Sequence, residues 1–237
     1  MPEISPADYD RIVVFTGAGM SAESGVPTYR GSGGIWHEYD WEAFACQQAF
    51  ETNPHKVLAF HHVRRKAVLQ CKPHAGHFIL SQLENKYKNI NIITQNIDGM
   101  HQRAGSGDVI ELHGSLWRAR CEQCGKSMED YTGVQLEKSC VCGYDLRPAI
   151  VWFGDSLDEN ILEEALGIME NCDLFISIGT SGQVWPAAGF PMAAKQSGAI
   201  LIEINTEANE TSHIYDHSCR GKAGDVLMQV FGLWLER

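Results

Sequence analysis

Residues 11–16 read Arg-Ile-Val-Val-Phe-Thr and lead directly into Gly17-Ala18-Gly19-Met20-Ser21-Ala22. The first stretch is apolar and rich in β-branched residues, which is typical of a buried strand. The second fits the pattern G-x-G-x-x-G/A, whose small residues let the backbone approach a pyrophosphate at the start of a helix. The same pattern also occurs in tight strand-to-helix turns that bind no ligand. With or without a ligand, the segment predicts the first strand and turn of an α/β sheet.

Similar apolar runs recur along the chain, at residues 90–94, 149–153, 174–178 and 200–204. Because these runs are almost continuously apolar, they fit strands covered on both faces, as in a parallel sheet. Helical patterns lie between them, at residues 54–70, 75–86, 159–170, 187–197 and 224–235. Strands that alternate with helices predict an α/β fold with a Rossmann-like parallel sheet.

Two stretches interrupt this alternation. Residues 31–75 contain helical pieces without a strong strand, and residues 120–147 are polar, turn-rich and cysteine-bearing. We interpret both as insertions that form a smaller module, one part helical and one part a zinc ribbon. The Rossmann-like core then comprises about residues 8–30, 76–119 and 148–237, within a single domain spanning residues 1–237.

The overall charge excludes some classes of partner. The chain carries 19 Lys and Arg against 30 Asp and Glu, so the net charge is −11. This balance provides no overall basic face for nucleic acid, although it is compatible with a local basic patch. No apolar run reaches the ~18–20 residues that span a bilayer, and no signal peptide is visible. We therefore expect no nucleic-acid or membrane partner, and a cytoplasmic protein with reduced cysteines. The sequence sets no oligomeric state, and a monomer is compatible with it.

Four of the eight cysteines are spaced as C-x2-C-x15-C-x-C, namely Cys121, Cys124, Cys140 and Cys142. Four thiolates at such spacing can surround one tetrahedral zinc ion, each pair coming from one turn. A glycine follows the second cysteine of each pair, as zinc knuckles prefer. Because four protein ligands close the coordination sphere, we predict a structural ion; the alternative is four unrelated buried cysteines.

Several sequence blocks carry a family resemblance. They are GAGMSAESGVPTYR at 17–30, TQNID at 94–98, ELHG at 111–114, the cysteine set, IVWFGD at 150–155, GTS at 179–181 and INTE at 204–207. In this order they resemble the sirtuin family of NAD-dependent protein lysine deacylases. The resemblance implies NAD as co-substrate and acylated-lysine proteins as partners. It also implies that nicotinamide, free lysine and O-acyl-ADP-ribose are the products.

The resemblance further implies roles for single residues. His113 matches the family's catalytic base, which is neutral near pH 7 and removes a proton relayed from a ribose hydroxyl. Asn96 and Asp98 match the pair that faces the nicotinamide end, polarises its carboxamide and orders a water. Without the resemblance, His113 would be a hydrogen-bonded loop histidine, and Asn96 and Asp98 would be turn caps. The other implied cofactor-binding residues are Gly17, Ala18, Gly19, Ser21, Ala22, Tyr29, Arg30, Gln95, Ile97, Gly179, Thr180, Ser181, Asn205, Glu207 and Ala223.

Two further sets of residues concern the acylated protein. Val151, Trp152, Phe153 and Gly154 match the family segment that pairs with the substrate backbone as an added strand. His61 and Arg64 lie three residues apart on one predicted helix face. Family members that remove succinyl or malonyl groups carry Y-x-x-R in this region; here the arginine is kept and histidine replaces the tyrosine.

Arg64 can pair with an acyl carboxylate, and His61 can donate a second hydrogen bond. The alternative is that HHVRRK, residues 61–66, is a solvated basic helix face. We therefore expect a lysine deacylase that removes succinyl, malonyl and acetyl groups. A deacetylase without preference for acidic acyl groups, an NAD glycohydrolase or ADP-ribosyltransferase, and a non-catalytic zinc-stabilised NAD-binding module are the alternatives.

Overall fold

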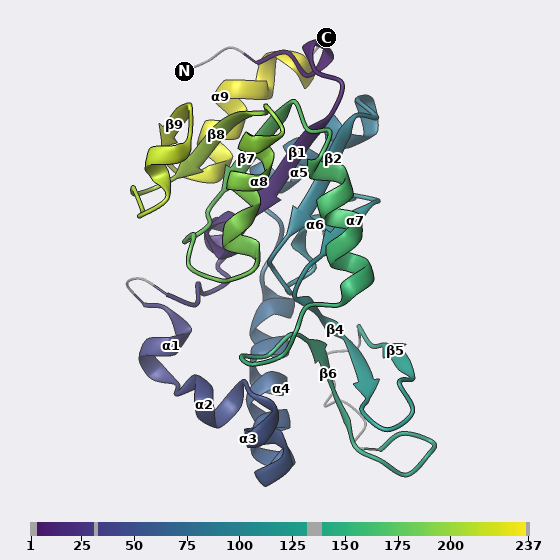
Figure 1. The fold of residues 1–237 in the computed structure, drawn as a ribbon. Coiled ribbons are helices and arrows are strands. Elements are labelled where there is room, and N and C mark those ends of the chain that lie inside the picture. Colours follow the sequence, from purple (N-terminus) through teal and green to yellow (C-terminus); the bar gives the residue numbers. More distant parts are fainter. Residues whose placement is uncertain (1–3, 31–32, 132–138, 236–237) are drawn as a thin grey trace.

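The computed structural model describes residues 4–30, 33–131 and 139–235, which form a large parallel sheet with helices and a smaller module beside it (Figure 1). The predicted α/β class is therefore confirmed. Among the described residues, no helix is both long and apolar enough to cross a membrane.

The large sheet contains six parallel strands in the order β3-β2-β1-β7-β8-β9. This is the strand order of a Rossmann fold, whose ligand crevice lies where the order reverses, here between β1 and β7. The apolar runs in the sequence indicated four of these strands, and the short strands β3 and β9 form no such run. The bounds are β1 Ile12–Thr16, β2 Ile90–Thr94, β3 Val109–Glu111, β7 Leu174–Ile178, β8 Ile200–Asn205 and β9 His217–Arg220.

Helices cover both faces of this sheet. Alternate residues of β1 point to opposite sides: Ile12 and Val14 pack with α5 and α9, whereas Val13 and Phe15 pack with α7 and α8. The strands are continuously apolar because helices cover both faces of the sheet, as predicted. The helices and 3-10 turns (η) of this part are η1 Pro6–Asp8, η2 Ala18–Ser24, α5 Ala75–Lys86, α6 Met100–Arg103, α7 Glu159–Met169, η3 Ala187–Gly189, α8 Phe190–Gln196, η4 Ser212–Ile214 and α9 Ala223–Leu235.

The smaller module has its own apolar core, to which Leu58, Leu116, Trp117 and Trp152 contribute. Its described residues form four helices and a three-stranded antiparallel sheet in the order β5-β4-β6. The helices come from residues 35–70, as the sequence predicted. The bounds are α1 Ile35–Glu38, α2 Trp41–Phe44, α3 Gln47–Thr52, α4 Pro54–Gln70, β4 Gly114–Cys121, β5 Ser127–Glu129 and β6 Leu146–Ile150.

One predicted strand was assigned to the wrong sheet. The run at residues 149–153 was expected in the parallel sheet, but β6 ends at Ile150 and pairs antiparallel with β4, opposite Cys121 and Gly114. The run is apolar because its side chains fill the core of the smaller module. An apolar run shows that a strand is buried and does not show which sheet buries it.

Candidate functional site

A cleft of about 460 Å³ lies at the carboxyl ends of β1, β7 and β8, the crevice position of a Rossmann sheet. It brings together residues from turns that are far apart in the sequence. The predicted cofactor-binding residues among its lining are Gly17, Ala18, Gly19, Tyr29, Arg30, Gln95, Asn96, Gly179, Thr180, Ser181, Asn205 and Glu207.

Glycines form the floor of this cleft because two backbone turns meet there. The N–H of Gly19 donates to the carbonyl of Gly179 at 2.9 Å. A Cβ at Gly17 would lie 2.8 Å from that carbonyl oxygen, and one at Gly19 would lie 2.7 Å from the Cα of Gly179. Gly179 itself has φ +62°. Only glycine allows this approach, which leaves backbone exposed where a pyrophosphate of NAD would fit.

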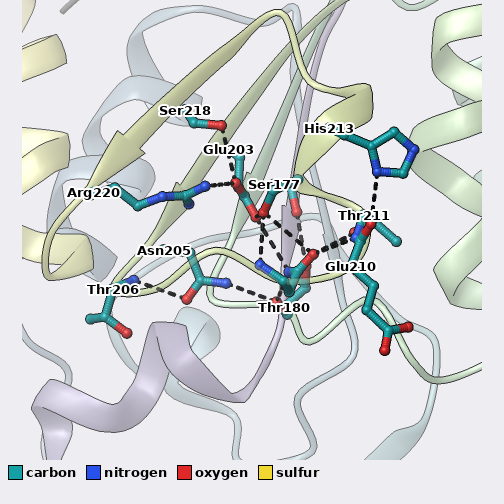
Figure 2. A network of polar contacts seen from close by, with 12 residues as sticks. Ser177, Thr180, Glu203, Asn205, Thr206, Glu210, Thr211, His213, Ser218 and Arg220 are labelled. Atoms are coloured by element: carbon teal, nitrogen blue, oxygen red, sulfur yellow. Dashed lines mark hydrogen bonds and ion pairs between the residues drawn. The ribbon is translucent and has the colours of Figure 1, made fainter.

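A buried polar network supports the far end of the cleft, and Figure 2 shows it at close range. The amides of Asn205 and Asn209 both donate to the carbonyl of Thr180, at 2.9 and 3.1 Å. Behind them Glu203, 2 % exposed, pairs with Arg220 at 2.6 Å. Glu203 also accepts from Ser212, Asn209 and Ser218. Glu203 was not predicted from the sequence, although a carboxylate inside the apolar run ILIEI is a visible signal.

Five predicted cofactor residues lie outside this lining, and two of them, Ile97 and Asp98, line a neighbouring hollow. Ser21 is buried beneath the turn, where its hydroxyl lies 3.4 Å from the amide nitrogen of Asn96. Ala22 and Ala223 are not among the described residues that line the clefts. Ala223 instead begins α9 in the sheet's core, next to Gly224, whose N–H donates to Glu23 at 2.8 Å.

A second cleft, of about 560 Å³, lies between the sheet and the smaller module. Its walls are largely aromatic and aliphatic, and include Trp36, Phe153, Leu162 and Trp185. All six predicted substrate-binding residues line it, namely His61, Arg64, Val151, Trp152, Phe153 and Gly154. The two clefts share Tyr29, Arg30, Gln95, His113 and Val184, so they meet at these side chains.

His113 lies at this junction with a defined tautomer. Its Nδ1 lies 3.0 Å from the backbone carbonyl of Gln95. Because a carbonyl only accepts, Nδ1 must carry the proton and Nε2 is left as a base. Burial lowers the pKa of His113, and the Gln95 bond offsets this only in part, so the imidazole is neutral at pH 7.

The glycine after His113 is required by the chain path. Gly114 has φ +73°, and a Cβ there would lie 2.0 Å from the carbonyl oxygen of Ala149 in β6. The carbonyl of His113 accepts from the N–H of Val151 at 2.9 Å. The His-Gly pair therefore joins β4 to β6 and carries the histidine to the junction.

Asn96 and Asp98 lie beside the junction, in a narrow hollow that also includes Tyr29, Arg64 and Ile97. The side-chain amide of Asn96 donates to the carbonyl of Gly17 at 2.9 Å, which ties β2 to the glycine turn. Asp98 accepts from the N–H of Met100 at 2.9 Å. Burial raises the pKa of Asp98, while hydrogen bonds from Met100 and Ser21 work in the opposite direction.

His61 is less available than the sequence suggested. It is 1 % exposed, and its Nε2 accepts a hydrogen bond from the indole N–H of Trp152 at 3.2 Å. Burial, followed by the charge of Arg64, lowers the pKa of His61 to about 3. His61 is therefore a neutral side chain whose Nε2 holds Trp152 and offers no proton to a ligand.

The basic stretch around His61 is not a solvated face. Arg64 is partly buried and donates to the hydroxyl of Tyr29 at 2.8 Å. Arg65 is fully buried, and its guanidinium bonds the carbonyl of Leu116 and the carboxylate of Asp130, both at 2.8 Å. Arg64 thus lines the second cleft, and Arg65 joins α4 to the smaller sheet.

Arg147 fixes the segment that carries Trp152, a role that the sequence analysis did not assign. Its guanidinium carbon lies 3.6 Å from the centre of the Trp152 ring, and the side chain is 1 % exposed. Its nitrogens donate to Asp155 and to Gln47 of α3, both at 2.7 Å. One buried cation therefore connects β6, the second cleft and the helical part.

The four predicted metal ligands lie together at one end of the smaller sheet. Their sulfur atoms all lie within 4.8 Å of one another, and the pairs Cys121–Cys142 and Cys124–Cys140 are 3.5 and 3.6 Å apart. A tetrahedral zinc with bonds of about 2.3 Å places its sulfur ligands about 3.8 Å apart, so the set fits zinc. Gly125 and Gly143 turn each knuckle with φ +69° and +88°. Four thiolates leave no open position, so the site is structural.

In the segment of residues 151–154, which was predicted to bind substrate, the backbone N–H groups of Val151 and Phe153 are already bonded within the protein. The N–H of Val151 bonds His113, and the N–H of Phe153 donates to the carbonyl of Ala45 at 3.0 Å. Phe153 also forms a parallel bridge with Cys46. These bonds hold the segment extended along the wall of the second cleft.

Comparison with known proteins adds an independent result. Residues 17–186 match the family model described as the Sir2 family. An NAD-dependent protein deacylase of Aquifex aeolicus is 42% identical over 95% of this chain and 96% of its own. One of Aeropyrum pernix is 47% identical over 89% of this chain and 87% of its own.

Solved structures give the same picture. A Sir2 homologue in complex with NAD is 41% identical, with a TM-score of 0.89 over 96% of this chain and 90% of that one. A Sir2–p53 peptide–NAD⁺ complex is 31% identical, with a TM-score of 0.85 over 98% and 96% of the two chains.

Proposed function

The chain belongs to the Sir2 family, and we propose that it is an NAD-dependent protein deacylase that removes succinyl, malonyl and acetyl groups from lysine side chains. The position of His113 carries this proposal. It lines both clefts, so a base with a free Nε2 lies where a dinucleotide and an acylated lysine would meet.

NAD bound in the first cleft would supply a ribose carbon that becomes electrophilic as nicotinamide leaves. The glycine turns after β1 and β7 would hold its phosphates, and Asn205 would hold the adenosine half. Asn96 and Asp98 would hold the nicotinamide end, in the hollow beside Tyr29. The acyl carbonyl of the substrate would approach from the second cleft.

His113 then acts as the general base. With Nδ1 bonded to Gln95, Nε2 would accept the proton of a ribose hydroxyl after the acyl oxygen had displaced nicotinamide, so that the hydroxyl could add to the acyl carbon. Water would then release the free lysine amine and leave the acyl group on ADP-ribose. General-base assistance of this kind contributes about 10²–10⁴-fold to the rate. The largely apolar walls of the second cleft would reduce the access of water to the reacting atoms once the substrate fills it.

Arg64 supports the acidic acyl groups within this proposal. It lines the second cleft, and a charged hydrogen bond to a carboxylate contributes about 1.5–3 kcal/mol. Many proteins would serve as substrates, because main-chain pairing along residues 151–154 gives affinity with little sequence preference. The four-thiolate zinc site suits a reducing compartment, and we place the enzyme in the cytoplasm.

Mass spectrometry of matched acetyl-, malonyl- and succinyl-lysine peptides incubated with NAD tests the proposal. We expect NAD-dependent loss of all three acyl groups and formation of O-acyl-ADP-ribose. A parallel incubation with NAD alone is the control. Rapid nicotinamide release without peptide, with every peptide intact, would show a glycohydrolase and contradict the deacylase.

A further inference from the structure

We propose that the hydroxyl of Tyr29 is the second carboxylate-binding group of the acyl site, acting beside Arg64. This inference rests on the proposed deacylase function and deepens it. The site for an acidic acyl group would then consist of Arg64 from the smaller module and Tyr29 from the segment between η2 and α1.

An acyl carboxylate needs more than one donor when it enters a largely apolar cleft. A carboxylate has about four lone-pair positions, and leaving them unsatisfied away from water is costly. Arg64 fills some of them. The neighbouring candidate, His61, is excluded as an Nε2 donor because that atom accepts from Trp152.

The hydroxyl of Tyr29 is positioned to donate a further hydrogen bond to the acyl carboxylate. Its hydroxyl oxygen lies 2.8 Å from Nη2 of Arg64, and the guanidinium carbon lies 4.9 Å from the centre of its ring. Both side chains line the second cleft. A phenol that accepts from a guanidinium still has its own proton to donate, and a cationic donor makes that proton a better one.

The contact also fixes the guanidinium. Arg64 lies against the rings of Tyr29 and Phe60, and its hydrogen bond to Tyr29 limits the orientations that it can adopt. An acyl carboxylate would then meet a pair that is already arranged, which reduces the ordering cost of binding. Tyr29 also lines the first cleft, so the same residue contacts the space of the dinucleotide and that of the acyl group.

The replacement of Tyr29 by phenylalanine isolates the hydroxyl, since the ring that packs on Trp36 with centres 5.7 Å apart is kept. The readout is the ratio of kcat/KM for a succinyl-lysine peptide to kcat/KM for a butyryl-lysine peptide of the same sequence. The two acyl groups have the same length and differ in the terminal carboxylate. Any effect of Tyr29→Phe on NAD binding alters both values and cancels in the ratio.

We expect Tyr29→Phe to lower this ratio by about tenfold or more, as for the loss of a hydrogen bond to a charged group. Arg64→Met should lower it further, and the double variant should be no worse than Arg64→Met, because the two groups act as one unit. Tyr39→Phe is the matched control. Tyr39 packs on Phe44 and Phe60 in the same module, and its variant should keep the ratio within about twofold.

A ratio in Tyr29→Phe within twofold of the wild type, or effects of Tyr29→Phe and Arg64→Met that multiply, would overturn the inference. Dissociation constants of the two peptides, measured by fluorescence anisotropy, give the same ratio if a variant turns over too slowly. Wild-type protein that removes butyryl but not succinyl groups would overturn the inference and leave a deacylase. Wild-type protein that removes neither, even with NAD, would overturn the proposed function as well.

Discussion

The two clefts that meet at His113 are built in different ways. The first is formed by backbone: turns after β1 and β7 approach so closely that a Cβ at Gly19 would lie 2.7 Å from Gly179. The second is formed by side chains from separate segments, with Trp152 held by His61 and Arg147. A backbone cleft accepts one constant ligand, whereas a side-chain cleft can change its ligand by single substitutions. This division would suit the proposed enzyme, which uses one co-substrate and removes several acyl groups.

Removal of zinc should have the largest effect, and it should impair the second cleft far more than the first. Replacement of Cys124 by alanine should abolish peptide deacylation. Structural zinc contributes about 10–16 kcal/mol in small zinc domains, as much as the stability of a whole domain. Affinity for ADP-ribose, measured by calorimetry, should stay within about fivefold, because distant sites behave independently.

Cys172→Ala provides the control for this variant. Cys172 is a buried cysteine of the sheet part and lies outside the four-sulfur cluster. Its replacement should leave the zinc content unchanged. Equal loss of ADP-ribose binding and of peptide deacylation in Cys124→Ala would show that the two clefts form a single unit.

Arg147→Met should damage the second cleft without reaching the first. Breaking a buried ion pair costs about 3–5 kcal/mol of unfolding free energy, and the loss should appear with a raised KM for peptide and an unchanged KM for NAD. Arg120→Met is the comparison, because Arg120 is 41% exposed and 3.8 Å from the same Asp155. Such an exposed pair contributes about 0–1 kcal/mol. Similar losses in the two variants would argue against a special role for Arg147.

Gly19→Ala should damage the first cleft in the same selective way. The methyl group meets the backbone of Gly179, so we expect a loss of about 1–3 kcal/mol and a raised KM for NAD, with peptide affinity retained. A methyl group at Gly167 of α7 would meet no atom within 4 Å, and Gly167→Ala should stabilise by about 0.5–1 kcal/mol. Urea denaturation of both variants measures the difference. An unchanged KM for NAD in Gly19→Ala would show that the turns do not shape the cofactor site.

The pH dependence of deacylation is the smallest of the expected effects, and it distinguishes the role of His113 from that of His61. Burial lowers the pKa of His113 below 6.5, so activity should be level at neutral pH and fall as the pH drops through that lowered value. His61 has a pKa of about 3 and should stay neutral over the same range. The profile of kcat/KM for wild type and His61→Asn should therefore share one acidic limb. Loss of the acidic limb in His61→Asn would show that the limb reflects protonation of His61, which would contradict its assignment to His113.

The first cleft could be predicted from the sequence because a short motif marks each of the turns that form it. Gly17 and Gly19 directly follow an apolar strand and Gly179 follows another, and the carboxyl ends of parallel strands meet at one edge of the sheet. The zinc ligands are equally visible, since each pair of cysteines belongs to one turn. The central strands of the large sheet were visible as apolar runs, whereas the edge strands β3 and β9 are too short to show a pattern.

The second cleft could be predicted only in part. His61 meets Trp152 across 91 residues, and Arg147 meets Gln47 across 100, so no local pattern reveals either contact. The helical spacing placed His61 and Arg64 on one face, but it could not show that the first is buried or that the second contacts Tyr29. The spacing of residues in the sequence does not show which side chains tertiary packing brings together.

The central claim is that the neutral imidazole of His113, at the junction of the two clefts, is the general base of deacylation. The activity of His113→Ala is its most direct test. The measurement compares kcat/KM for an acetyl-lysine peptide in wild type and variant, with the ADP-ribose dissociation constant as the check on the first cleft. We expect kcat/KM to fall by about 10²–10⁴-fold while ADP-ribose still binds. Deacylation that continues at close to the wild-type rate would contradict it.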